Sequence, residues 1–135
     1  MIKELLFNQK PDILLTKMLD KSALNQRVIA SNVANIGTPG YERLGVSFDE
    51  KLARAMRLSK KIKISDPRHI PSPDWVKEIK PEVVKIEDGY WNGINNVNID
   101  EEMVDLAKNQ LDFNIGVRLM SSKFNALRTA IRGRR

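Results

Sequence analysis

The fold is decided by residues 99–131, which read IDEEMVDLAKNQLDFNIGVRLMSSKFNALRTAI. Apolar side chains recur in this stretch at alternating spacings of four and three, the a/d heptad pattern of a helix that packs along another helix. The seam consists of Ile99, Met103, Leu106, Gln110, Phe113, Val117, Met120, Phe124, Leu127 and Ile131. Such a helix is roughly 50 Å long. We expect a partner helix, because a domain this small cannot easily cover so long a stripe with its own core.

A matching stripe follows residues 15–36, near the other end of the chain. Its members are Leu15, Leu19, Ser22, Gln26, Ile29, Val33 and Ile36. Polar residues within such seams cost stability and can fix the register and the number of partners. Two interpretations are open: the stripes pack on each other as a two-helix hairpin, or their apolar members also pack on neighbouring subunits.

Both helices carry signals at their ends. The first is predicted to begin near Pro11, which suits a first turn, and to stop at the Asn-Gly and Pro-Gly turns of residues 35–40. The second is predicted to begin after Asn98, with Glu101 three residues on as in a capping box, and to end at Gly133.

These patterns predict a mainly α fold, in which two long terminal helices with heptad seams form a coiled-coil-like core. We expect an N-terminal helical segment (1–41), a partly extended, loop-rich insert with short β-strands (42–97) and a C-terminal helix (98–135). Gly116 lies within the second helix and costs about 1 kcal/mol relative to alanine. A close approach of the two helices is the reason we expect for this glycine.

The insert carries short and mixed signals. Residues 48–58 favour a short helix, whereas residues 61–64 and 82–86 alternate like strands. Four of the six prolines fall within residues 67–81, which favours an extended or loop-like connection.

The composition argues against several functional classes. The 135 residues include no cysteine, which excludes disulfides and thiolate chemistry. Residues 1–10 do not resemble a cleavable secretory signal, and the apolar runs are too short for a membrane span. The single histidine, His69, has only Asp66 as a close candidate ligand, and no phosphate-binding loop or dinucleotide fingerprint exists. We therefore predict no catalytic residue, no metal site and no cofactor.

The charge is distributed unevenly along the C-terminal helix. The chain has a net charge of +6, and no acidic residue follows Phe113. The other end of this helix is acidic, so the polarity complements the helix dipole. An alternative function follows from the same feature: a basic helical adaptor that binds nucleic acid or a partner helix. We favour no nucleic-acid partner, because no aromatic or RNA-binding motif accompanies the charge.

Residues 28–41, which read VIASNVANIGTPGY, resemble the N-terminal signature of bacterial flagellar rod and hook proteins. In that family a helix ends in Ser-Asn-x-Ala-Asn, and Thr-Pro-Gly-Tyr follows two residues later. Residues 98–111 and 119–134 resemble the second helix and the closing segment of basal-body rod members, in particular the proximal ones. The turn-motif residues that match are Asn32, Asn35, Thr38, Pro39, Gly40 and Tyr41.

The resemblance implies a structural protein and not an enzyme. It implies a subunit of the flagellar basal-body (proximal) rod, self-assembling through its terminal helices into a hollow axial drive shaft. The implied partners are copies of itself, other rod and basal-body proteins, and the flagellar export apparatus. The implied location is the basal body, spanning the periplasm after type III export. The candidate subunit-packing residues are Leu15, Leu19, Ile29, Val33, Ile36, Ile99, Met103, Leu106, Phe113, Val117, Met120, Phe124, Leu127 and Ile131.

Phe48 and Leu52 stand one helical turn apart and share a face of the predicted short helix. In exported flagellar subunits, a Phe followed four residues later by an aliphatic residue resembles a docking signal for the export gate. The other interpretation is a short amphipathic helix that packs on the rest of the chain, and both stay open at this point.

Overall fold

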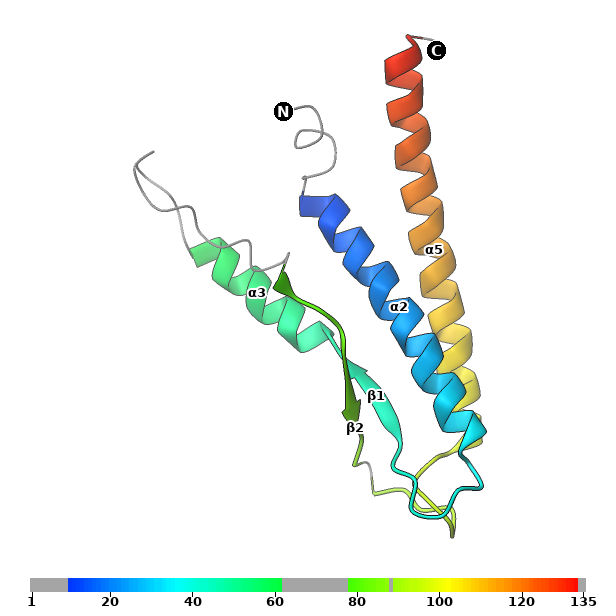
Figure 1. Ribbon diagram of the computed structural model, residues 1–135. Coiled ribbons are helices and arrows are strands. Elements are labelled where there is room, and N and C mark those ends of the chain that lie inside the picture. Colours follow the sequence, from blue (N-terminus) through cyan, green and yellow to red (C-terminus); the bar gives the residue numbers. More distant parts are fainter. Residues whose placement is uncertain (1–9, 62–77, 88, 134–135) are drawn as a thin grey trace.

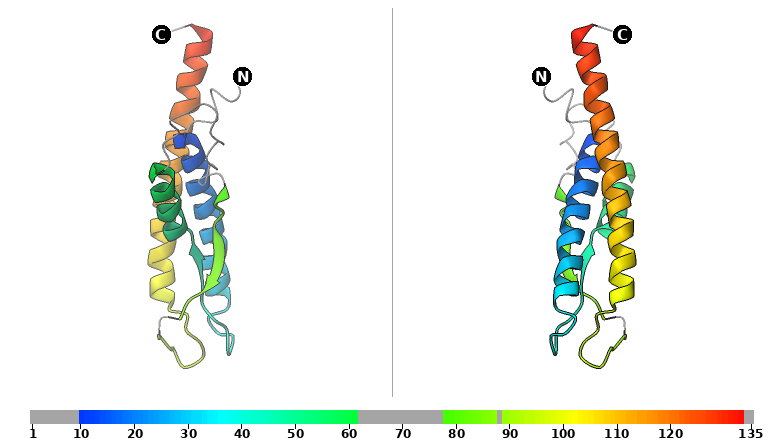
Figure 2. Two further views of the ribbon diagram at one scale, coloured as in Figure 1. Left: turned by 90° about the vertical axis from the view of Figure 1, so that its left-hand side faces the viewer. Right: turned by 90° about the vertical axis from the view of Figure 1, so that its right-hand side faces the viewer.

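The computed structural model describes residues 10–61, 78–87 and 89–133. It confirms the mainly α prediction: two long helices run side by side in opposite directions, flanked by a small sheet and a shorter helix (Figures 1 and 2). In chain order the elements are α2 (Lys10–Ala34), β1 (Leu44–Ser47), α3 (Asp49–Lys61), β2 (Glu82–Lys85) and α5 (Ile99–Arg132).

The ends of the long helices follow the predicted signals. The first turn of α2 contains Pro11. At the start of α5, the Asn98 side chain accepts a hydrogen bond of 3.0 Å from the Asp100 backbone N–H. Glu101, the predicted partner in a capping box, lies 3.4 Å from the Arg43 guanidinium. At the other end, Gly133 has a φ of 62°, the left-handed conformation in which glycine closes a helix.

One line of α5 residues, seven apart in sequence, faces α2 directly. Its members are Glu102, Asn109, Gly116 and Lys123. The predicted seam is therefore wrong as the line that contacts α2, because at four positions it named the next residue along. Six of its ten residues are exposed: Ile99, Met103, Gln110, Val117, Phe124 and Ile131. Polar and small residues give no hydrophobic signal, so an apolar pattern passes over them. The other four seam residues are half-buried beside this line: Leu106, Phe113, Met120 and Leu127.

Polar contacts join the two helices along this line. The Asn109 amide donates a hydrogen bond of 2.9 Å to the Ser22 carbonyl, and both residues are buried. Nearer the C-terminus, the Lys123 ammonium forms an ion pair with the Asp12 carboxylate. Buried polar residues at such positions fix helix register, because sliding one helix would separate their partners.

Gly116 allows the helices to approach closely. A Cβ atom at this position would lie 2.8 Å from the Cδ2 atom of Leu19. The close approach expected from the sequence is confirmed, and Leu19 of the first stripe packs in the space that a side chain would fill.

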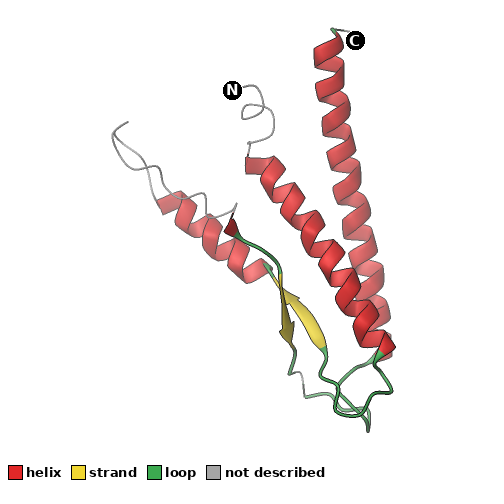
Figure 3. Cartoon of the chain, viewed as in Figure 1, coloured by secondary structure: helices red, strands yellow, loops and turns green. Residues whose placement is uncertain are grey.

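The insert folds back along α2. The strands β1 and β2 pair antiparallel, with Leu44 opposite Lys85 and Ser47 opposite Glu82, and β1 packs on α2 (Figure 3). The predicted strand at residues 82–86 is confirmed as β2. Its partner β1 was not predicted, because a strand of four residues that includes a glycine shows no clear alternation of apolar and polar residues.

The other predictions for the insert have mixed outcomes. The predicted helix at residues 48–58 is confirmed as α3, which runs from Asp49 to Lys61. The predicted strand at residues 61–64 is wrong at Lys61, which ends α3, and its other residues lie outside those described.

The buried apolar core is small. Among the described residues it consists of Val28, Ile29, Phe48 and Val97. This core lies where the second half of α2 meets β1 and the segment that leads into α5. Over residues 10–61, 78–87 and 89–133, no helix is long and apolar enough to cross a membrane.

We predict that Gly116→Val destabilises the folded chain by about 1–3 kcal/mol, because the new side chain would overpack against Leu19. The measurement is the urea midpoint of the purified protein. Ala126→Val is the matched control, because it adds the same side chain at an exposed position of α5. Equal midpoints for the two variants would contradict the close approach at Gly116.

Candidate assembly site

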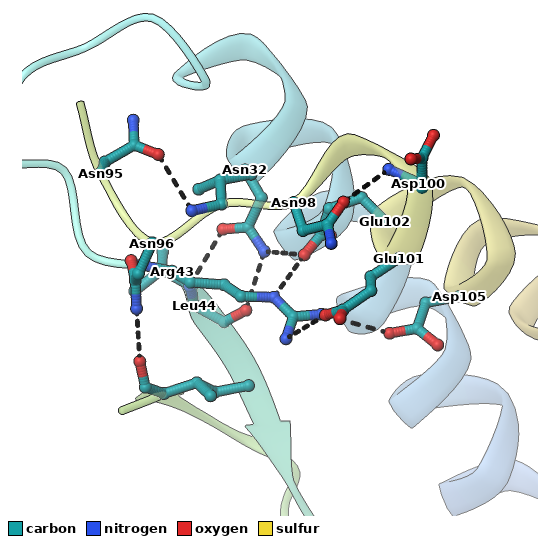
Figure 4. Close-up of polar contacts among 12 residues, drawn as sticks. Asn32, Arg43, Leu44, Asn95, Asn96, Asn98, Asp100, Glu101, Glu102 and Asp105 are labelled. Atoms are coloured by element: carbon teal, nitrogen blue, oxygen red, sulfur yellow. Dashed lines mark hydrogen bonds and ion pairs between the residues drawn. The ribbon is translucent and has the colours of Figure 1, made fainter. Parts of the chain in front are cut away.

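A largely buried polar cluster joins the C-terminal end of α2 to the start of α5. It consists of Asn32 from α2, Arg43 from the segment before β1, Asn95 and Asn96 from the segment before α5, and Glu102 from α5 (Figure 4). We call these five residues the junction cluster. Its side chains come from segments far apart in sequence, so it forms only when the chain is folded.

Asn32 is the centre of the junction cluster. Its Nδ2 atom donates to the Leu44 carbonyl at 2.9 Å and to Glu102 Oε1 at 3.2 Å. Its Oδ1 atom accepts from the Leu44 N–H at 3.0 Å and from the Tyr41 hydroxyl at 3.1 Å. A buried amide can donate twice and accept twice, so Asn32 is fully satisfied. This one side chain holds α2, β1 and α5 together.

Glu102 is a buried carboxylate on the inner face of α5. Its Oε1 atom accepts a hydrogen bond of 2.6 Å from Arg43 Nε. The Arg43 guanidinium also lies 3.4 Å from Glu101 and 3.4 Å from Asp105, one turn along the same helix. Burying an unpaired charge costs several kcal/mol, so Glu102 depends on the arginine. Arg43 in turn places the start of β1 against the first turns of α5.

Asn95 holds the turn that follows α2. Its Nδ2 atom lies 3.0 Å from the carbonyl of Asn35, 2.9 Å from that of Ile36 and 3.0 Å from that of Thr38. Buried carbonyls that pair with no regular helix or strand need other donors. The fully buried Asn95 supplies one from a segment some sixty residues away in sequence.

Asn96 and an exposed ion pair connect the strands to this region. The Asn96 side chain accepts from the Arg43 N–H at 2.6 Å and donates to the Ile86 carbonyl at 2.7 Å. Beside them, a hydrogen bond and charge attraction from Glu42 raise the pKa of Lys85. That pair is exposed and contributes little to stability.

The predicted turn-motif residues divide into three pairs. Asn32 and Tyr41 meet in the junction cluster, where the Tyr41 hydroxyl also lies 3.1 Å from Ser31 Oγ. Asn35 donates to the Ser31 carbonyl at 2.8 Å, and its Oδ1 atom accepts from Thr38 Oγ1 at 3.2 Å. The remaining two lie in the exposed turn, where a positive φ of 72° suits the glycine: Pro39 and Gly40.

Four members of the junction cluster were missed in the sequence: Arg43, Asn95, Asn96 and Glu102. Glu102 is one of three acids in the first turn of α5, so nothing local distinguishes it from its neighbours. The available signal was the presence of Asn, Arg and Glu residues at the ends of the segments. Such side chains can satisfy backbone groups where helices stop. Nothing local in the sequence pairs them.

The predicted subunit-packing residues lie in three kinds of environment. Ile29 is buried. Most of the others are half-buried between or beside the helices: Leu15, Leu19, Val33, Ile36, Leu106, Phe113, Met120 and Leu127. Five are exposed on α5: Ile99, Met103, Val117, Phe124 and Ile131. Their packing on other subunits stays a prediction.

A second exposed apolar row was not predicted. It consists of Val104, Leu111, Ile115 and Leu119, which we call the outer row of α5. Leu111 exposes 63% of its surface. Large exposed apolar patches on a folded protein mark surfaces that bind other molecules.

Phe48, the candidate export residue, lies in the core. It is only 2% exposed, and the Lys21 ammonium lies 6.0 Å from the centre of its ring. Leu52 is half-buried one turn further on, and its N–H donates to the Phe48 carbonyl at 2.9 Å. In the folded chain, Phe48 and Leu52 pack at the start of a short amphipathic helix. Docking through Phe48 would therefore require an unfolded chain.

The site connects segments of the chain that are distant in sequence. Among the described residues no group of three or more His, Cys, Asp or Glu side chains could hold a metal ion. The junction cluster orients the two long helices, and α5 then presents its apolar rows outward.

The chain is similar to several flagellar basal body rod proteins named FlgB. The relative from Bacillus subtilis is 35% identical over 119 residues, which cover 88% of this chain and 91% of the relative. The one from Borreliella burgdorferi is 31% identical over 124 residues, covering 86% and 91%. The one from Salmonella typhimurium is 23% identical over 121 residues, covering 85% and 88%. No family model matches the chain.

We predict that Asn32→Ala destabilises the fold by about 3 kcal/mol, because it leaves buried backbone groups of Leu44 without partners. Thermal unfolding of the purified protein measures this. Asn114→Ala removes an exposed amide of α5 and should change stability by less than about 0.5 kcal/mol. Similar losses in both variants would show that the junction cluster does not hold the segments together.

Proposed function

This chain belongs to the FlgB family of flagellar basal body rod proteins, and we propose that it is a structural subunit of the proximal part of that rod. In this role it performs no chemistry and requires no cofactor. Its task is to present surfaces that hold neighbouring subunits in a fixed arrangement.

The observation that carries the proposal is the exposed apolar surface of α5. The pairing with α2 uses a line of mostly polar and small residues, Glu102, Asn109, Gly116 and Lys123. Large apolar side chains of α5 therefore remain exposed, among them Leu111 and Ile115. A long helix whose large apolar side chains are exposed is suited to packing against other helices.

Assembly proceeds through the two terminal helices. Apolar residues lie on opposite flanks of α5, with Val117 on one side and Ile115 on the other. Two different surfaces that meet each other make a heterologous contact, and such contacts repeat into rings or helical tubes. Copies of this chain and other rod proteins would together form a hollow axial shaft.

The same proposal includes the route to the site of assembly. The chain reaches the basal body through the flagellar export apparatus and takes its place in the part of the rod that spans the periplasm. The small core supports passage through the apparatus in an unfolded form, because few buried apolar side chains must be exposed beforehand.

We predict that Leu111→Gln abolishes or strongly reduces incorporation into the rod while the isolated chain keeps its stability. The exposed Leu111 contributes little to the fold, whereas burying it in each contact between subunits is worth about 1.5–3 kcal/mol. The amount of this chain in purified basal bodies, together with swimming, is the readout. Asn114→Gln is the control on the same helix, and normal incorporation of both variants would refute assembly through the outer row.

We also predict that Phe48→Ala blocks secretion through the export apparatus without lowering cellular levels. Because Phe48 is a core residue, the variant also loses roughly 3–5 kcal/mol of stability. Val97→Ala is the control, because it truncates another fully buried side chain outside the Phe48–Leu52 pair. If both variants are secreted equally well, Phe48 acts only in folding.

A further inference from the structure

A groove lies between α2, α3 and α5. Its volume is about 420 Å³. The apolar part of its lining comes mainly from both long helices and α3: Leu15, Met18, Leu19, Leu52, Ile115 and Leu119. Its charged lining consists of Asp49, Asp105 and Asp112 together with Lys21 and Lys108. Asp49 pairs with Lys21, and Asp105 pairs with Lys108 and Arg43. The groove is therefore an apolar trough with one net negative charge, contributed by Asp112.

The C-terminal end of α5 carries an exposed apolar side chain and basic groups. The ion pair between Lys123 and Asp12 marks the level at which α2 begins, and residues 124–132 continue past it. Ile131 is 78% exposed there, the largest value among the exposed large apolar side chains. Arg128 and Arg132 lie beside it along the same surface, and no acidic residue occurs in this part of α5. We call residues 124–132 the basic end of α5.

The groove and the basic end are complementary in polarity, and the Asp112 carboxylate is complementary to the arginines. An apolar helix surface bordered by arginines fits an apolar trough that carries this carboxylate, and such charge pairs set the partner and the orientation of a contact. The groove cannot bind its own basic end, because Ile115 and Leu119 in its wall belong to the same continuous helix. The occupant must come from a second molecule.

We propose that the basic end of α5 in one copy binds in the groove between α2, α3 and α5 of the next copy. The proposal rests on the proposed function and names the surfaces that meet in the assembled rod. The contact is heterologous, so each copy offers one groove and one basic end, and the chain of contacts continues. If Ile131 packs beside Ile115, neighbouring copies are displaced along the helix axis by roughly 24 Å, at ~1.5 Å per residue.

The test uses the absence of cysteine from the chain. Ile131→Cys and Ile115→Cys are introduced together, and intact basal bodies are treated with a short bismaleimide. Both positions are exposed, so the substitutions leave the folded chain intact. We expect a ladder of cross-linked multimers of this chain. Ile131→Cys with Val117→Cys is the matched control, because Val117 is exposed on the other flank of α5.

Charge reversal provides a second measurement on the same contact. Asp112→Arg in the cross-linking background should reduce the ladder by roughly two- to fivefold, the effect expected from losing an exposed charge pair. Adding Arg128→Asp should restore the ladder, because the two reversed charges attract each other again.

The outcomes separate this inference from the function on which it rests. Basal bodies that contain the chain but give no ladder, or an equal ladder with the Val117 control, overturn the docking and leave the rod function standing. Cross-linking to a rod protein of a different size overturns docking between copies of this chain. Absence of the unmodified chain from basal bodies overturns the proposed function itself.

Discussion

The buried contact between Asn32, Glu102 and Arg43 is the interaction on which the rest of the structure depends. Each of the three residues comes from a different segment, and Glu102 would be an unpaired buried carboxylate without the other two. Such a cluster is favourable only when it is complete, because partial satisfaction leaves the desolvation cost uncompensated. The end of α2, the start of β1 and the start of α5 therefore become ordered together at this point, and the helices extend from it.

The composition of the helix pair explains why the molecule has so much apolar surface on the outside. Asn109 and Lys123 occupy positions that leucine would hold in a self-sufficient coiled coil, and Gly116 occupies a third. These residues set how the helices align but bury little apolar surface. The large hydrophobic side chains of α5 remain exposed and available to other partners. The same sequence therefore specifies a fold with a small apolar core and a large binding surface.

Much of the architecture could be predicted from the sequence, because helix ends have local causes. Asn98 and Gly133 terminate α5 through groups within a few residues, and the helical period of the stripes is a local property. The face that meets α2 could not be predicted, since Glu102 and Asn109 acquire their partners only when Asn32 and Ser22 approach from another helix. The junction cluster escaped prediction for the same reason. Most of its pairings join segments that lie more than fifty residues apart in sequence.

The polar layers between α2 and α5 have a mechanical consequence. A force along the helix axes would load this pair in shear, and a seam of leucines resists sliding weakly because one leucine replaces another. Here a slip of one heptad, roughly 10 Å, would carry Asn109 away from the Ser22 carbonyl and Glu102 away from Asn32 at the same moment. The close fit of Leu19 over Gly116 adds a steric stop between these layers. The helix pair should therefore resist sliding without stable intermediate positions, until these contacts break together.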